Sequence, residues 1–317
     1  MKELPRLILA REHVQLGLTP KQLAGRCNSG ALVRVRHGVY VDGASWQALE
    51  EWEQYRVRVS AAAQALMAPT VFARHSAASV WRIPTIGRRH PVYALTMRND
   101  GGRSRAGIKR HYASPAGLEV VRREGLLVTG RVRTVLDLAA FTTFAEAVVP
   151  VDHVLRADRA QGLPALTKET LLAGIDGNYT AAAARRIRVA VEFADARSGS
   201  AGESYGRALM WIAGFESPAL QYEMRDHSGL VGYTDYYWDG ARVAGEFDGV
   251  VKYLKPEYLR GRTPSQAVVD EKLREDRIRA SGIGVVRWVW DELRADGQLE
   301  RKLAAAGVPR RRARSAQ

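Results

Sequence analysis

Residues Asp235–Lys252 read DYYWDGARVAGEFDGVVK, and this stretch has the pattern of a β-hairpin that carries acidic side chains. Residues 231–238 are β-branched or aromatic at most positions, which is typical of a strand. The pair Asp239-Gly240 is a strong signal for a two-residue turn, because both residues tolerate the positive φ of a type I′ turn. We therefore expect residues 241–248 to return as the second strand, with Asp235 across from Ala244.

The acidic side chains of this hairpin are expected on one face of the sheet. Side chains alternate with a period of two along a strand, so Ala244, Glu246 and Asp248 share the face of Asp235. Asp235 and Glu246 are then diagonal neighbours, with Cα atoms about 7–8 Å apart. Two carboxylates at this spacing can ligate one Mg²⁺ ion, whose bonds to oxygen are about 2.0–2.1 Å long. The pattern predicts a Mg²⁺ or Mn²⁺ site held by Asp235, Glu246 and Asp248, while a solvated acidic face is the alternative.

The segments on either side of the hairpin carry further candidates for the same chemistry. Upstream, Ser200-Ala-Gly-Glu203 has the pattern of a capping box that opens an amphipathic helix, so Glu203 is either a metal ligand or the cap partner. Downstream, Lys252 follows the last acid, and Thr263 begins a second helix that runs to about Ala280. That second helix carries three basic candidates: Lys272, Arg274 and Arg277.

The stretch from about residue 195 to residue 294 resembles the Vsr-like endonuclease domains of the PD-(D/E)XK superfamily. The resemblance covers about a third of the chain and implies a metal-dependent nuclease core, in which a mixed sheet is flanked by helices. The motifs that carry it are Ser200-x-x-Glu203, Asp235, Glu246-Phe-Asp-Gly249, Lys252-Tyr253, Glu271-Lys272-Leu-Arg-Glu-Asp276-Arg277 and Val285-Val-Arg-Trp-Val-Trp290.

The chain departs from the superfamily at one position. The expected Glu-x-Lys motif would end in a lysine at position 248, where this chain has Asp248. Lys252 or Lys272 would then supply the cation, or Asp248 would be a third metal ligand. In an active core the ion would lower the pKa of a water that attacks a phosphodiester, whereas a core without a positioned lysine would only bind. The predicted catalytic set is Glu203, Asp235, Glu246, Asp248, Lys252 and Lys272, and Arg274 and Arg277 are predicted to face nucleic acid.

The first 45 residues have the pattern of a separate DNA-binding unit. Thr19-Pro-Lys-Gln22 is a capping box at the start of a helix, and His37-Gly38 is a turn between two short basic strands. The order of helix, helix and basic hairpin predicts a winged helix-turn-helix. The side chains expected to contact DNA are Lys21, Arg26 and Asn28 from the helix and Arg34 and Arg36 from the wing.

This N-terminal segment is similar to the winged-helix domain of AbiEi-type antitoxins, which binds promoter DNA in that family. Gly17-Leu-Thr-x-x-Gln-Leu23 and Arg36-His-Gly-Val-Tyr40 carry the similarity. The middle of the chain shares the order of His75-Ser-Ala-Ala78 and Arg133-Thr-Val-x-Asp137-Leu-Ala139 with the same proteins. The resemblance implies a DNA partner and allows a cognate toxin as a second partner.

Composition supports a polyanionic partner. The 317 residues include 48 Lys and Arg against 34 Asp and Glu, which gives a net charge of +14, and such a field attracts nucleic acid in a salt-dependent way. The lone cysteine, Cys27, excludes an internal disulfide and is typical of a protein of the reducing cytoplasm. The sequence contains no run of about 18 apolar residues, so no membrane span is expected.

These patterns predict an α/β (α+β) protein of several parts. We expect a winged helix over residues 1–45, an α/β middle domain over 46–160, a helical connector over 161–199, a restriction-endonuclease-like domain over 200–294 and a basic tail over 295–317. The predicted function is a DNA-binding protein with a metal-dependent endonuclease domain, acting in phage defence or DNA processing. The alternative is a transcriptional repressor or antitoxin whose nuclease-like domain is inactive.

Overall fold

The protein is described from a computed structural model, which covers residues 4–15, 19–66, 68–87, 89–96, 104, 107–113, 118–249 and 263–311. Its helices accompany three sheets, so the α+β fold class is confirmed. The chain divides into two compact units. The N-terminal unit comprises residues 1–142 and 167–188, and the C-terminal unit comprises residues 143–166 and 189–317. Lys252 and Tyr253 lie outside the described residues.

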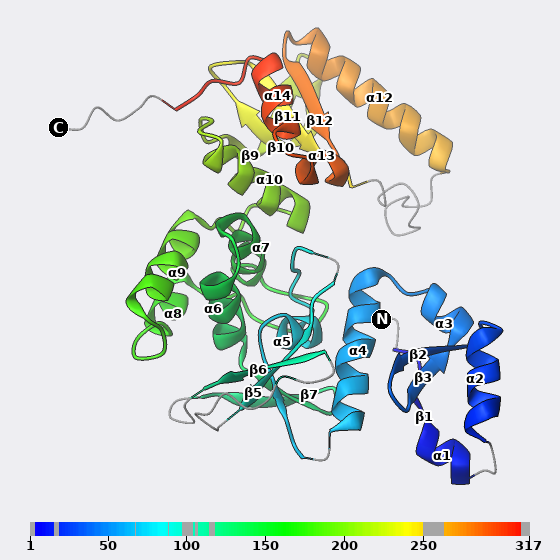
Figure 1. Cartoon of the computed structure of the whole chain (residues 1–317). Helices are drawn as coiled ribbons and strands as arrows, with labels where there is room; N and C mark the ends of the chain where they lie inside the picture. The colour runs from blue at the N-terminus through cyan, green and yellow to red at the C-terminus, as the bar shows by residue number, and fades with distance from the viewer. Residues whose placement is uncertain are drawn as a thin grey trace. The chain divides into compact units, whose positions relative to one another are not determined.

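The N-terminal unit begins with a three-stranded antiparallel sheet beside two short helices (Figure 1). Thr19 caps the second helix through the predicted reciprocal capping box with Gln22. The two longer strands turn at His37-Gly38, where Gly38 has a φ of +70°. The helix that Thr19 caps and the hairpin are confirmed, and the helix expected before them is the short Ala10–Gln15, which follows a strand. The elements are β1 (Ile8–Leu9), α1 (Ala10–Gln15), α2 (Pro20–Asn28), β2 (Leu32–Arg36) and β3 (Val39–Asp42).

The rest of the N-terminal unit is built on a five-stranded mixed sheet in the order β6-β5-β4-β8-β7. The long helix α4 packs on the small N-terminal sheet, where its Ala61 contacts Leu9 and Val39. Arg133 donates to Asp137 at 2.8 Å, so these two motif residues form an ion pair within one helix. The elements are α3 (Gly43–Gln47), α4 (Glu51–Ala65), β4 (Val71–Phe72), α5 (Arg74–Trp81), β5 (Val92–Thr96), β6 (Ile108–Tyr112), β7 (Val120–Arg123), β8 (Leu126–Thr129), α6 (Arg131–Phe141) and α8 (Lys168–Ala173).

The C-terminal unit is built on a four-stranded mixed sheet in the order β12-β11-β10-β9. Strands β9, β10 and β11 pair antiparallel, and β12 joins β11 in parallel after the crossover helix α12. The elements are α7 (Phe144–Val154), α10 (Ala201–Ile212), β9 (Ala219–Asp226), β10 (Gly229–Trp238), β11 (Val243–Phe247), α12 (Pro264–Ala280), β12 (Gly284–Trp288), α13 (Trp290–Arg294) and α14 (Gln298–Ala305). Helix α9 (Ala181–Phe193) begins in the N-terminal unit and ends in the C-terminal unit, because the division falls after Arg188.

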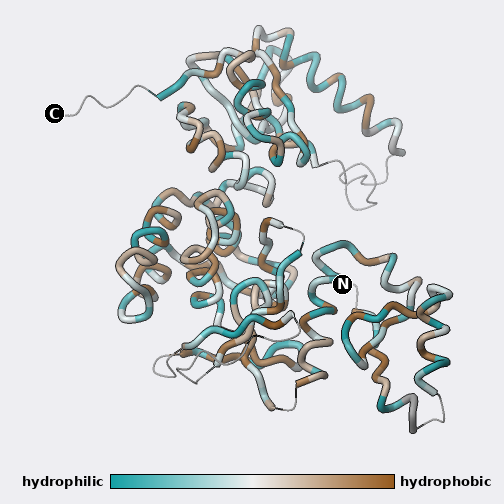
Figure 2. The backbone as a smooth tube through the Cα atoms, viewed as in Figure 1, coloured by the Kyte–Doolittle hydropathy of each residue, from teal (hydrophilic) through white to brown (hydrophobic). Residues whose placement is uncertain are grey.

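Both faces of this sheet are covered. On one face, α10, α13 and α14 pack over a core that includes Tyr236, Trp238 and Trp288. On the other face, α12 contributes Ile278 to a smaller cluster. Hydrophilic residues predominate along α12, with a few hydrophobic positions among them (Figure 2). The predicted mixed sheet with flanking helices is therefore present.

The predicted domain boundaries do not coincide with the compact units. The expected connector over residues 161–199 is shared, because residues 167–188 pack with the N-terminal unit and the remainder with the C-terminal unit. The expected tail also begins with folded structure, since α14 buries Leu299 and Leu303 in the core of the C-terminal unit. Residues 295–311 thus belong to that unit. No described helix is both long and apolar enough to cross a membrane.

Candidate functional site

The site is positioned by the β10–β11 hairpin, whose register differs from the prediction. Tyr237 pairs with Ala244 and Trp238 with Val243, so the connection is a four-residue loop over 239–242 and not a two-residue turn. The loop closes because the Arg242 amide donates to the Asp239 carbonyl at 3.0 Å. The predicted register is therefore wrong by two residues. A shift of two keeps every side chain on its face. Continued one residue beyond the Tyr236–Gly245 pair, this register places Asp235 across from Glu246 instead of diagonal to it.

Three of the predicted acids line one cavity of about 280 Å³ in the C-terminal unit. Asp235 lies on β10 and Glu246 on β11, and Asp248 is the residue that directly follows β11. Glu246 is 9 % exposed, so its carboxylate is largely withdrawn from water. The remaining lining residues are Tyr233, Phe247, Glu271, Arg274 and Arg287.

Two arginines neutralise Glu246. Arg274 on α12 donates to one carboxylate oxygen at 2.5 Å, and Arg287 on β12 approaches the other at 2.8 Å. Both guanidinium groups also contact Glu271, which lies one helical turn before Arg274. Burial alone lowers the pKa of Arg274, but the hydrogen bonds and charge of Glu271 and Glu246 outweigh it and raise that pKa above its ordinary value. The two cations are thus fixed in the charged state beside the acids.

The carboxylate of Asp235 is held by the sheet itself. Its Oδ2 accepts the backbone amide of Phe247 at 2.8 Å, and its Oδ1 accepts the side-chain amide of Gln221 at 3.4 Å. The same Gln221 nitrogen donates to Glu203 at 3.0 Å. Gln221 therefore connects the acid on α10 with the acid on β10. Its backbone has a φ of +50°, a region that favours glycine, and such strain is typical of functional positions.

Glu203 has a structural role as well as a place beside the site. Ser200 caps α10 by accepting the Glu203 amide at 3.2 Å, while the Glu203 carboxylate accepts the Gly199 amide at 2.6 Å. The close packing of α10 on the sheet brings it there, because a Cβ on Gly202 would lie 2.1 Å from the Phe247 ring. Glu203 thus combines a capping contact with a contact to Gln221, and it does not line the cavity.

The predicted cations are distributed differently from the expectation. Lys272 is exposed on α12 and does not line the cavity, and Lys252 lies outside the described residues. Arg277 forms a two-armed pair with Asp226, with both nitrogen–oxygen distances at 2.7 Å. Arg274 points into the acidic cavity. Among the described residues, the cations beside the acids are therefore arginines, Arg274 and Arg287.

The donor atoms in the cavity suit a hard divalent ion. Asp235, Glu246 and Asp248 provide carboxylate oxygens, which Mg²⁺ and Mn²⁺ prefer, so the residues fit the predicted ion in their chemistry. In the part of the chain that the structure describes, no three His, Cys, Asp or Glu side chains are already gathered as a metal-binding group. An ion bound to Glu246 would have to displace the two guanidinium groups from its carboxylate or share the carboxylate with them.

The predicted DNA-binding side chains of the N-terminal unit are mostly open to solvent. Lys21, Arg26 and Asn28 are exposed on α2, and Arg34 is exposed on β2. Arg36 is half-buried and lines a cavity beside α4. Four of the five residues are thus accessible on the helix and strand where they were expected.

The predicted site residues did not include Gln221, Glu271 or Arg287, although Glu271 and Arg287 belong to motifs named in the sequence analysis. Arg287 could have been found, because it pairs in parallel with Glu246 and adjacent strand partners share a face. The spacing of Glu271 and Arg274 by three residues also places both on one helix face. Nothing in the sequence signals Gln221, whose position depends on a strained backbone.

Comparisons with known proteins identify relatives without assigning a function. No family model matches the chain. Two curated proteins of Mycobacterium tuberculosis, named uncharacterized protein MT2308 (strain CDC 1551 / Oshkosh) and uncharacterized protein Rv2248 (strain ATCC 25618 / H37Rv), are each 27 % identical over 289 residues, which is 90 % of this chain and 96 % of theirs. The crystal structure of the RV2827C protein from the same species is similar at a TM-score of 0.36 and 16 % identity, over 70 % of this chain and 84 % of that one.

Proposed function

We propose that the protein binds nucleic acid, with DNA as the expected form, and that its C-terminal unit is a Mg²⁺- or Mn²⁺-dependent phosphodiesterase. One observation carries the proposal: Asp235, Glu246 and Asp248 line the same small cavity as Arg274 and Arg287. Carboxylates bind divalent ions and guanidinium groups bind phosphate oxygens. A cavity that joins both chemistries suits a phosphodiester, and the basic chain would attract the polymer.

Each residue has a distinct part in this proposal. Asp235, Glu246 and Asp248 would hold the ion, which would supply a bound water of lowered pKa. Arg274 and Arg287 would neutralise negative charge on the phosphate oxygens. The Phe247 amide and Gln221 would keep Asp235 in position through the bonds that they donate to it. Lys252 stays a candidate for orienting the water, and the exposed Lys272 has no part in the cavity.

The pairing of Glu246 supports a second candidate function. Both of its oxygens are bound by arginine, so a protein that never admits an ion would be stable in this arrangement. Such a protein would bind DNA without cutting it, as a transcriptional repressor or an antitoxin with a toxin partner. The exposed Lys21, Arg26 and Arg34 of the N-terminal unit would serve either function.

Cleavage assays separate the two candidates. Supercoiled plasmid would be incubated with Mg²⁺ or Mn²⁺ and with wild type, Asp235→Asn or Glu246→Gln. We expect the wild type to nick the plasmid and each variant to lose about a hundredfold in rate, the scale of removing one group that stabilises a transition state. Asp291→Asn is the matched control, because that side chain is 92 % exposed on α13.

The other outcomes decide against the nuclease. If no protein cuts but all retard DNA in a gel, the repressor or antitoxin is favoured. If wild type and both site variants nick equally, the activity comes from a contaminant and the proposed mechanism is rejected.

A further inference from the structure

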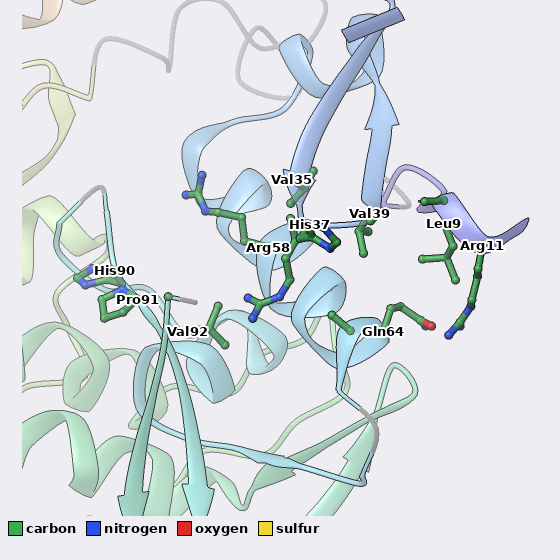
Figure 3. A pocket seen from close by; sticks show the side chains of 15 residues that line it. Leu9, Arg11, Val35, His37, Val39, Arg58, Gln64, His90, Pro91 and Val92 are labelled. Carbon is green, nitrogen blue, oxygen red and sulfur yellow. The ribbon is translucent and has the colours of Figure 1, made fainter. Parts of the chain in front are cut away.

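A larger cavity, of about 830 Å³, lies within the N-terminal unit. Figure 3 shows Leu9, Val35 and Val39 on the strands of the small sheet, with Arg58 on α4 and His90, Pro91 and Val92 at the start of β5. Cavities of this size hold small organic ligands. None of its lining residues belongs to the acidic site of the C-terminal unit.

The charge of this cavity is one-sided. Arg11, Arg36 and Arg58 line it together with His37 and His90, and its lining contains no carboxylate. Within the described ranges of the chain, no Asp or Glu forms an ion pair with any of the three arginines. In the acidic site, by contrast, each arginine is paired with two or more carboxylates. The lining of the cavity therefore presents positive charge that suits a bound anion.

Arg58 is held in place, and both Arg58 and Arg36 are partly withdrawn from water. The Arg58 guanidinium lies 5.9 Å from the Trp46 ring centre and 5.8 Å from that of Tyr55, which orients it through cation–π contact. Burial lowers the pKa of Arg58, and burial together with the charge of Arg110 lowers the pKa of Arg36. The charge of Glu51 acts against the effect of burial on Arg58, yet the pKa of Arg58 stays lowered. A bound anion would offset the cost of withdrawing both cations from water.

The remaining wall of the cavity is apolar. Leu9, Val35 and Val39 pack from the small sheet, and Val92 closes the side formed by β5. Inorganic phosphate would use the arginines but would leave this apolar wall and most of the volume uncontacted. A ligand with a phosphate at one end and a flat ring at the other would use both.

From these observations we propose that the cavity, here called the arginine pocket, binds the phosphate ester of a nucleotide. Arg36 and Arg58 bind the phosphate oxygens, and the base or sugar lies against Leu9, Val35 and Val39. The phosphate belongs either to a free nucleotide or to the phosphorylated end of a strand, since both present the same chemistry. The proposal is independent of cleavage by the C-terminal unit.

The test is calorimetric titration of the full chain with four probes. They are ADP, adenosine, a short 5′-phosphorylated oligonucleotide and the same oligonucleotide with a 5′-hydroxyl. We expect ADP, the phosphorylated strand, or both to bind at least about tenfold more tightly than the phosphate-free partner, the scale of one charged hydrogen-bond partner. Tighter binding of ADP identifies a free nucleotide, and binding of the phosphorylated strand alone identifies a strand end.

Variants locate the binding. Arg36→Gln and Arg58→Gln should each weaken the preferred probe about tenfold. Arg185→Gln removes the same charge from an exposed position on α9 and should leave the affinity unchanged. If Arg58→Gln fails to fold, Arg36→Gln alone decides. The proposal is overturned if wild type shows no preference for either phosphorylated probe, or if a folded Arg36→Gln binds as tightly as wild type.

Discussion

At the scale of single residues, the acidic site depends on hydrogen bonds and ion pairs that hold its carboxylates beside two guanidinium groups. The placement of Asp235, Glu246 and Asp248 on one face could be predicted, because side chains alternate along a strand. The hydrogen bonds and ion pairs that hold these acids in position could not be predicted. Gln221 bonds two acids from a φ of +50°, and a strained residue has no local signature when the surrounding fold imposes the strain.

Asp226 provides a pH-dependent prediction. Its hydrogen bonds with Arg277 lower its pKa to about 2 in the folded protein, against an ordinary value of about 3.9. A depressed carboxyl pKa stabilises the fold above the ordinary value, and this contribution is lost as the pH falls toward the folded value. We expect Asp226→Asn to be less stable than wild type by a constant amount between about pH 5 and 7.

The difference should then narrow between about pH 4 and pH 2, the interval bounded by the two pKa values. Urea denaturation of both proteins across this range measures it. A stability difference that is the same at pH 3 and pH 6 would show that the pair with Arg277 does not lower the pKa of Asp226.

At the scale of elements, the strands of the β10–β11 hairpin could be predicted from the sequence, but its turn could not. The strands and their acidic face were predictable, because hydrophobic alternation persists over several residues. The turn was not, since Asp239-Gly240 suits a two-residue connection, yet Arg242 also takes a positive φ of 51° and lengthens the loop. A local turn signal competes with the pairing of the flanking strands, and here Trp238 pairs with Val243.

The contact between α10 and the sheet yields a second prediction. A Cβ on Gly202 would lie 2.1 Å from the ring of Phe247, the residue that also anchors Asp235. We expect Gly202→Ala to lower the free energy of unfolding by about 1–3 kcal/mol, as overpacking does. Gly240→Ala is the matched control, because nothing lies within 4 Å of the added carbon. Chemical denaturation measures both, and equal stability of the two variants would contradict the close packing of α10.

At the scale of the whole molecule, the chain returns to each unit after leaving it. Residues 143–166 belong with residues 189–317 although another segment intervenes. Sequence patterns divide a chain into consecutive pieces, so they could not show this exchange. They also could not show that α14 completes a core, although the spacing of Leu299 and Leu303 fits one helix face.

A buried ion pair connects the separated parts of the C-terminal unit. Asp152 on α7 is fully buried and bonds Arg207 on α10 at 2.8 and 3.0 Å. Removing one partner of such a pair leaves an uncompensated charge and costs about 3–5 kcal/mol. We expect Asp152→Ala to lower the unfolding free energy by that amount, whereas Asp291→Ala at an exposed position should change it little. A loss below about 1 kcal/mol for Asp152→Ala would indicate that the pair stabilises no more than a surface ion pair does.

The central claim is that the acids of the C-terminal unit hold a divalent ion despite the two arginines beside Glu246. Electron paramagnetic resonance titration of Mn²⁺ into the full chain, with and without an oligonucleotide, tests this most directly. We predict that the wild type binds one Mn²⁺ ion. The affinity for Mn²⁺ should fall about tenfold or more in Asp235→Asn and in Asp248→Asn, which is the scale of removing a group that supports a metal. The affinity should be unchanged in Asp291→Asn. An absence of bound Mn²⁺ in wild type under both conditions, or equal binding by all four proteins, would contradict the claim.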